Sequence, residues 1–326
     1  MVTVEQARAR VGTNRSAALD VVRVLAVVAV VAGHAYSLHP WTSRLIFSWH
    51  VPIFFVLSGY LWTPGRALAT EVRKRSRTLL VPYVGWLLIV TAGWWLVRLH
   101  RGRSLHDPFF HRLFKGGAYI GMPYSPFWFI TALFFAAVTY RLIEKLAGPW
   151  TPVAGAGVGI VGLVIAQHDP QALASVWWAA GLALPCLVFV AAGTFLKLAR
   201  PHVPAPAVLG ALLLLAGGLA LRSGVSPVNV KSGFFGDPAI SVLTSIGLCV
   251  GLVLLVDGLL AGTRSRAVST LAAAALPVVF AHCLFLVVLA EEPFDAPVWV
   301  FVTAVTLPWL AALAIARSRP LSAVLL

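Results

Sequence analysis

Asp20, Arg23 and His34 lie within one long apolar run near the start of the chain, and His50 opens the next run. Ionisable side chains at membrane depth are costly, so each is first a functional candidate. Eleven helical steps of about 100° bring His34 back to within roughly 20° of Arg23, about 16 Å further along the axis. Asp20 joins the same face. The alternative is a snorkelling arginine with a histidine at the opposite interface.

Only a short polar segment separates the two runs, so His34 and His50 should be neighbours in an antiparallel pair. A neutral imidazole in apolar surroundings can act as a general base near neutral pH. Pro52 follows His50 closely, which predicts a kink or a first helical turn there. Ser58 and Gly59 are small enough for close helix packing. Ser58 is not a hydrolase nucleophile, because the G-x-S-x-G motif is missing.

The elements that must position these residues are membrane helices. Of the 326 residues, 60% are hydrophobic and only 11% charged, against about 25% charged in a typical soluble domain. Apolar runs of roughly 20 residues recur to the end of the chain, which predicts an all-α polytopic bundle. We expect one domain over residues 1–326. Ten spans are predicted, at 17–36, 46–64, 79–97, 126–143, 151–167, 175–196, 204–221, 239–260, 268–290 and 297–316.

The distribution of basic residues predicts the orientation. With residues 1–16 as a cytoplasmic tail, sixteen basic residues lie inside and eight outside, five of the latter in loop 98–125. This ratio favours both termini on the cytoplasmic side of the cell (plasma) membrane. The net charge of +14 is then explained by basic loops and contact with membrane lipids rather than by nucleic acid.

A second group of candidates is the basic run Arg73, Lys74, Arg75 and Arg77, which leads directly into an apolar span. It is either a topology determinant or a grip for an anion, since guanidinium groups suit phosphate and pyrophosphate.

Three further features lie deeper in the chain. Tyr119, Tyr124, Trp128 and Phe129 form either an aromatic belt or part of a site. His282 falls in the middle of an apolar run, either as a site residue or as a hydrogen-bonded core residue. The cysteines, Cys186, Cys249 and Cys283, also fall in apolar runs with no metal-ligand spacing, and we interpret them as core residues.

The chain resembles the acyltransferase 3 family of membrane O-acyltransferases, in particular the short forms similar to fucose 4-O-acetylase. The resemblance rests on Arg23-x10-His34, WHVPIFFVLSGY (Trp49–Tyr60), RKRSRTLLVPY (Arg73–Tyr83), SPFWFITALFF (Ser125–Phe135) and VVFAHCLF (Val278–Phe285). It extends over nearly the whole chain, and ten spans are also expected of that family. The sequence departs from the family at DVVR (Asp20–Arg23), where many members carry a glycine, and we expect no C-terminal esterase-like domain of the kind found in some long members.

The resemblance implies transfer of an acyl group, usually acetyl from acetyl-CoA, to a hydroxyl of a carbohydrate or similar acceptor. By position it makes His34 the catalytic histidine with Arg23 as its partner, and His50 a further catalytic candidate. It assigns Lys74, Arg77 and Arg73 to acyl-CoA binding. Trp128 and His282 are then substrate-binding candidates, and no metal is expected.

The chemistry expected is attack of a hydroxyl on the thioester, with His34 as general base. An acyl-histidine intermediate is an alternative, and Arg23, His50 or His282 could stabilise the oxyanion. The acceptor would be chosen by loops 98–125 and 222–238. A secondary transporter or exporter is the alternative function, although no second half of the chain repeats the Arg23-x10-His34 pattern.

Overall fold

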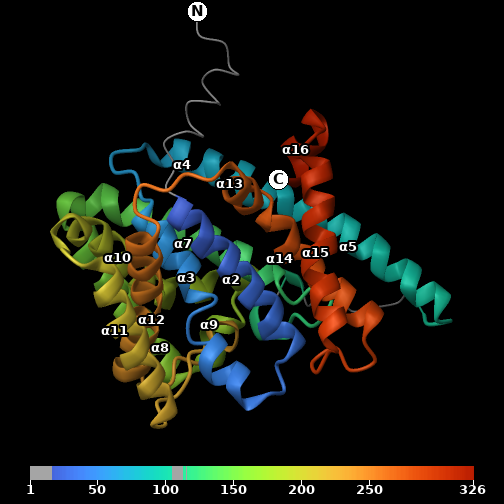
Figure 1. The fold of residues 1–326 in the computed structure, drawn as a ribbon, viewed down its shortest axis with the longest axis horizontal. Coiled ribbons are helices and arrows are strands. Elements are labelled where there is room, and N and C mark those ends of the chain that lie inside the picture. Colours follow the sequence, from blue (N-terminus) through green and yellow to red (C-terminus); the bar gives the residue numbers. More distant parts are fainter. Residues whose placement is uncertain (1–16, 105–112, 115) are drawn as a thin grey trace, which may run out of the picture.

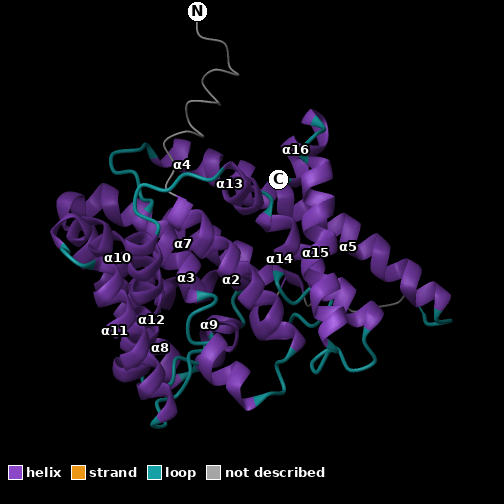
Figure 2. Cartoon of the chain, viewed as in Figure 1, coloured by secondary structure: helices purple, strands orange, loops and turns teal. Residues whose placement is uncertain are grey.

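The computed structural model describes residues 17–104, 113, 114 and 116–326. Within these residues the protein is helical, apart from one isolated bridge between Asn229 and Phe234 (Figures 1 and 2). The predicted all-α fold is therefore confirmed. The predicted tail, residues 1–16, lies outside the described residues, as do Arg112 and Lys115 of the basic loop.

The helices follow the apolar runs in chain order. They are α2 (Ala17–Ala35), α3 (Pro52–Tyr60), α4 (Leu68–Arg75), α5 (Val81–His100), α7 (Phe127–Ala147), α8 (Thr151–His168), α9 (Pro170–Ala174), α10 (Ala183–Ala199), α11 (Pro206–Arg222), α12 (Pro238–Leu259), α13 (Arg266–Ala273), α14 (Ala275–Leu289), α15 (Val298–Ile315) and α16 (Arg319–Leu325). Figure 1 shows α4 and α13 at the end of the bundle where α2 begins.

Six helical stretches of the described residues are long and apolar enough to cross a membrane, or seven if the bent pair α13 and α14 counts as one. These numbers differ from the ten predicted spans for three reasons. The stretch Phe127–His168 contains two predicted spans, because Gly148, with φ +54°, ends α7 and α8 then packs back against it. The helices α3 and α11 have only 9 and 17 residues.

The second predicted span, 46–64, is the one that the fold changes most. Residues 42–46 form a wide helical turn, and α3 begins only at Pro52. Proline lacks an N–H and suits the first turn, so this part of the prediction is confirmed. A helix of 9 residues is about 14 Å long and cannot cross a bilayer core of about 30 Å alone. It is buried within the protein, where irregular backbone is tolerated at membrane depth.

The close packing predicted at Gly59 is present between α3 and α10. A Cβ on Gly59 would overlap the carbonyl oxygen of Val190, and a Cβ on Gly193 would overlap that of Val56. Each helix therefore places a glycine against the backbone of the other. This close contact fixes the position of α3 along α10.

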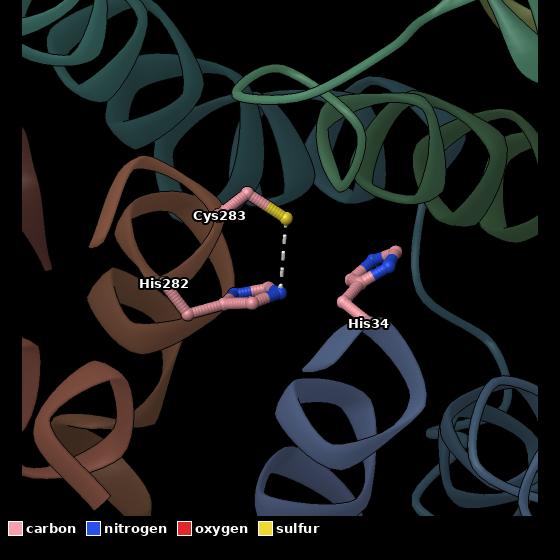
Figure 3. Close-up of side chains that lie close together, drawn as sticks. All are labelled: His34, His282 and Cys283. Atoms are coloured by element: carbon pink, nitrogen blue, oxygen red, sulfur yellow. Dashed lines mark hydrogen bonds between the residues drawn. The ribbon is translucent and has the colours of Figure 1, made fainter. Parts of the chain in front are cut away.

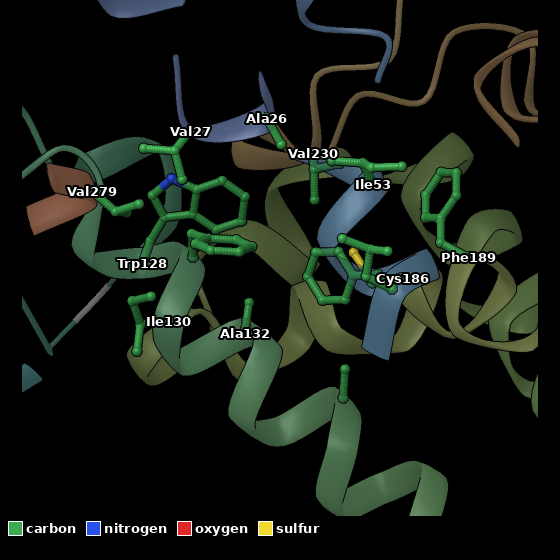
Figure 4. Close-up of a cluster of buried hydrophobic side chains, with 14 of the residues drawn as sticks. Ala26, Val27, Ile53, Trp128, Ile130, Ala132, Cys186, Phe189, Val230 and Val279 are labelled. Carbon is green, nitrogen blue, oxygen red and sulfur yellow. The ribbon is translucent and has the colours of Figure 1, made fainter. Parts of the chain in front are cut away.

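The core of the bundle joins α2, α3, α7, α10 and α14. Figure 4 shows Trp128 of α7 directed toward Val27 of α2 and Val279 of α14, with Ile53 of α3 in the same cluster. The helices that carry the predicted site residues are thus packed against one another.

Candidate active site

Three histidines from separate segments meet at one end of the bundle. His34 lies in the last turn of α2, His50 in the turn before α3, and His282 within α14. The rings of His34 and His282 stack, with centroids 5.0 Å apart and planes at 20° (Figure 3). His34 and His50 both line a cavity of about 210 Å³, as their predicted proximity required. We call this space the histidine cavity.

Backbone contacts orient two of these rings. The Nδ1 atoms of His50 and His282 each lie 2.8 Å from the carbonyl oxygen four residues earlier, of Ile46 and Val278 respectively. Because a carbonyl can only accept, Nδ1 carries the proton in both neutral rings and Nε2 carries the lone pair. Nε2 of His282 is 3.3 Å from Sγ of Cys283, so the thiol can donate to it.

The rest of the histidine cavity has apolar walls and a few convergent polar groups, which is typical of small-molecule sites. The polar groups are Ser37, Ser125, Asn229 and Lys231. The apolar walls include Val30, Phe47, Phe54, Val51, Pro126, Trp128, Phe129, Val228, Val230, Val279 and Phe294. Trp128, predicted as a substrate-binding candidate, is therefore part of the wall.

Lys231 is the site residue that sequence reasoning missed. The sequence places it only in loop 222–238, but in the structure this loop turns into the bundle. Its Nζ donates to the carbonyl oxygen of Ile120 at 2.7 Å and to Oγ of Ser125 at 2.6 Å. Burial lowers the pKa of Lys231 to about 8. A lone lysine in a Gly/Pro-rich loop carries no periodic signal that could have located it.

A second cavity, of about 450 Å³, lies toward the end of the bundle where α2 begins, and we call it the basic cavity. Arg23, Lys74 and Arg75 line it. Phe54, Phe129 and Val279 line both cavities, so the two spaces lie back to back across these three side chains.

Arg23 and His34 share a helix face, but they do not share a cavity. Arg23 pairs with Asp20 at 3.0 Å, and the second carboxylate oxygen of Asp20 accepts from Ser269 at 2.8 Å. The rise of about 16 Å along α2 separates the guanidinium from the imidazole. Arg23 lines the basic cavity, and His34 the histidine cavity.

The residues of the basic run, Arg73 to Arg77, also differ in their positions. Lys74 and Arg75 line the basic cavity, whereas Arg73 and Arg77 are exposed and are not among the described residues that line either cavity. The predicted set had Arg73 and Arg77 and omitted Arg75 from acyl-CoA binding. Helical spacing explains the difference, because Arg73 and Arg77 lie four residues apart and so share one helix face, which is the exposed one.

Arg75 is held by a buried carboxylate. Glu71 pairs with Arg75 at 2.8 Å, with Arg66 at 2.5 Å and with Arg141 at 3.4 Å. Arg75 also donates to Oγ of Ser58 at 3.3 Å, which ties the run to α3.

Residues 16–317 match the acyltransferase 3 family, described as an acyltransferase domain. The chain belongs to this family. No curated protein and no solved structure matched the chain in the corresponding comparisons. With its apolar helices, family membership makes the protein a multi-pass membrane acyltransferase that takes an acyl donor and an acceptor.

In this acyltransferase, Cys283 is buried, as predicted for a core residue, and it lies beside two histidines. Ligand atoms of His34, His282 and Cys283 lie within 4.8 Å of one another, a set that could hold a soft metal ion (Figure 3). Lys231 is within electrostatic reach of Cys283, and its charge opposes a cation there. Cys186 and Cys249 are buried in α10 and α12, as predicted for core residues.

Proposed function

We propose that the protein transfers an acyl group, acetyl by the family resemblance, from acyl-CoA to a hydroxyl of a carbohydrate or similar acceptor. The observation that carries the proposal is the pair of adjoining cavities, one lined by cations and the other by histidines. A CoA thioester has the matching polarity, with phosphates at one end and the reactive carbonyl at the other.

The donor would bind from the basic cavity. Arg23, Lys74 and Arg75 offer the charge and the hydrogen-bond donors that a pyrophosphate needs. The pantetheine arm would then pass between Phe54, Phe129 and Val279, which separate the two cavities. This path brings the thioester to His34 and His50.

His34 acts in this proposal as the general base. The acceptor oxygen attacks the thioester carbon while its proton moves to the imidazole, and the carbonyl electron pair moves onto oxygen. Collapse breaks the C–S bond, and the imidazolium returns the proton to the departing CoA thiolate. Base assistance of this kind contributes about 10²–10⁴-fold. The acyl-histidine route differs by placing label on the protein when acetyl-CoA is supplied without acceptor.

We also propose that both termini face the cytoplasm of the cell membrane and that ten segments occupy the membrane, counting α3 and α11. The donor then enters from the cytoplasm, and the acceptor reaches the histidine cavity from the other side. Accessibility of single cysteines placed at Arg66 and at Ser223 tests this orientation. Labelling of both positions from the same side would contradict it.

The activity test follows acetyl transfer from radiolabelled acetyl-CoA by purified protein in nanodiscs, with extracts of the host envelope as acceptor. Wild type is compared with His34→Ala and with His168→Ala, an exposed histidine at the end of α8. We expect transfer by the wild type and the control and loss in His34→Ala. Full transfer by folded His34→Ala would refute the role of His34, and no CoA-dependent transfer by the wild type would refute the proposed function.

A further inference from the structure

Lys231 is a half-buried cation with neutral partners. Its Nζ donates to the carbonyl oxygen of Ile120 and to Oγ of Ser125. Across residues 17–104, 113, 114 and 116–326, no carboxylate forms an ion pair with it. By contrast, Arg141, which is fully buried, pairs with both Glu71 and Glu144. An unpaired charge that is partly removed from water costs free energy that the fold must offset elsewhere.

The loop that carries Lys231 is built to hold it in place. Asn229 and Phe234 exchange backbone hydrogen bonds of 2.7 and 3.1 Å across the segment. Gly233, with φ +72°, packs so closely that a Cβ would overlap the carbonyl oxygen of Pro170. The position of the ammonium group in the histidine cavity is therefore fixed by backbone pairing and close packing.

Two of the three N–H groups of Lys231 are used by Ile120 and Ser125, which leaves one for a ligand. Lys231 shares the histidine cavity with His34 and His50, while its other walls are largely apolar. A cation in such a setting stabilises negative charge far more strongly than it could in water.

We propose that Lys231 donates to the thioester carbonyl oxygen and stabilises the oxyanion formed during acyl transfer. The inference rests on the proposed function. As the acceptor oxygen bonds to the carbonyl carbon, the π pair moves to the carbonyl oxygen and is held by the third N–H of Lys231. When the C–S bond breaks, the pair returns and the ammonium keeps its proton throughout. The proposal therefore makes Lys231 the oxyanion donor. The sequence alone had offered Arg23, His50 and His282 for this role.

An acceptor that carries a permanent negative charge is the other anion that Lys231 could meet. The oxyanion is favoured because Lys231 has one N–H left, whereas a carboxylate or phosphate offers several acceptor sites that need donors. The two cases differ in kinetics, because an interaction made only in the transition state lowers kcat when it is removed and leaves KM unchanged.

The test compares wild type, Lys231→Met, Lys231→Arg and the control Lys145→Met, an exposed lysine of α7. The probe is radiolabelled acetyl-CoA with host-envelope extract, and folding is checked by thermal melting. We expect Lys231→Met to lower kcat by about 10²–10³-fold with KM for acetyl-CoA unchanged. Lys231→Arg should keep a larger part of the activity, and Lys145→Met should behave as wild type.

The pH profile gives a readout that survives if Lys231→Met does not fold. Because the ammonium form is required, wild-type kcat should fall as the pH rises through about 8, and this limb should be missing in Lys231→Arg. The other titratable groups around Lys231 are His34, His50, His282 and Cys283. The same alkaline limb in Lys231→Arg would assign it to one of these and overturn the proposal.

The remaining outcomes of the transfer assay also decide whether the inference about Lys231 holds. Undiminished transfer by Lys231→Met overturns this inference alone, as does a loss confined to acceptors that an anion-exchange column retains, which would make Lys231 an acceptor-binding residue. Absence of CoA-dependent transfer by the wild type overturns the proposed function and this inference with it.

Discussion

The imidazole rings of His34 and His282 lie face to face, although α2 and α14 stand near opposite ends of the chain. Two further contacts join the C-terminal end of α2 and the residues after it to the loop that follows α14. The backbone N–H of Ala296 donates to the carbonyl oxygen of Ala35 at 3.0 Å, and His39 lies 2.9 Å from Asp295. The orientation of the His34 ring is therefore set by an interface between distant segments.

Substitutions at His282 separate positioning from chemistry. His282→Phe keeps an aromatic face against His34, whereas His282→Ala removes it. If stacking positions His34, we expect kcat to fall less than about tenfold in His282→Phe and about 10²-fold in His282→Ala, as for a misplaced catalytic group. Single-turnover transfer measures both. Equal, severe losses would instead show that a nitrogen of His282 takes part directly.

The contact between α3 and α10 predicts intolerance of the smallest possible side chain. Gly59→Ala and Gly193→Ala each force the two backbones apart and should destabilise the protein by at least about 1–3 kcal/mol. Gly157→Ala on α8 is the matched control, because a Cβ there has open space. Thermal melting in detergent measures the difference. Unchanged melting of both variants would contradict the packing described.

Removing only the charge of Glu71, by the substitution Glu71→Gln, should destabilise the protein. Its side chain is 1% exposed and contacts three guanidinium groups. Glu71→Gln leaves these cations without their shared carboxylate, and loss of one partner from a buried network typically costs about 3–5 kcal/mol. The exposed Glu292→Gln is the control. Denaturant titration of the two variants side by side would reveal whether the network contributes as expected.

A bulkier side chain between the two cavities should block acetyl transfer without weakening the binding of CoA. Val279→Phe adds bulk where Phe54 and Phe129 already meet. We expect acetyl transfer to fall by at least about tenfold while CoA binding, measured by calorimetry, stays unchanged, since misplaced reacting groups can cost about 10²-fold. Val302→Phe, on an exposed face of α15, is the control. Transfer at the wild-type rate would place the donor path elsewhere.

The pKa of Lys231 predicts how stability varies with pH. Burial lowers this pKa from 10.5 to about 8, so between these values the unfolded chain binds more protons than the folded chain. The contribution of this group to stability therefore rises with pH across that window, by about 1.4 kcal/mol per pKa unit, and is constant below it. Melting curves from pH 7 to 10 should show the rise in wild type and a weaker one in Lys231→Met.

The apolar runs sufficed to predict an all-helical membrane fold, and the glycine at position 59 and proline at position 52 were read correctly. Periodicity also placed Arg23 and His34 on one face. It could not show that they serve different cavities, because that depends on what packs at each end of α2. The sequence alone identifies Lys231 only as a loop residue and Cys283 only as a core residue, for a similar reason. Their positions close to His34 arise from packing between segments far apart in the chain, which local patterns do not encode.

The network around Glu71 also determines how the basic cavity can bind. Arg66, Arg75 and Arg141 face Glu71 and Glu144, so three guanidinium groups are balanced by only two carboxylates. Arg75 is thus immobilised before any anion arrives, and ordering such a side chain on binding would otherwise cost about 0.5–1.5 kcal/mol. Arg75 is therefore preorganised, and its conformational entropy is lost on folding rather than on binding an anion.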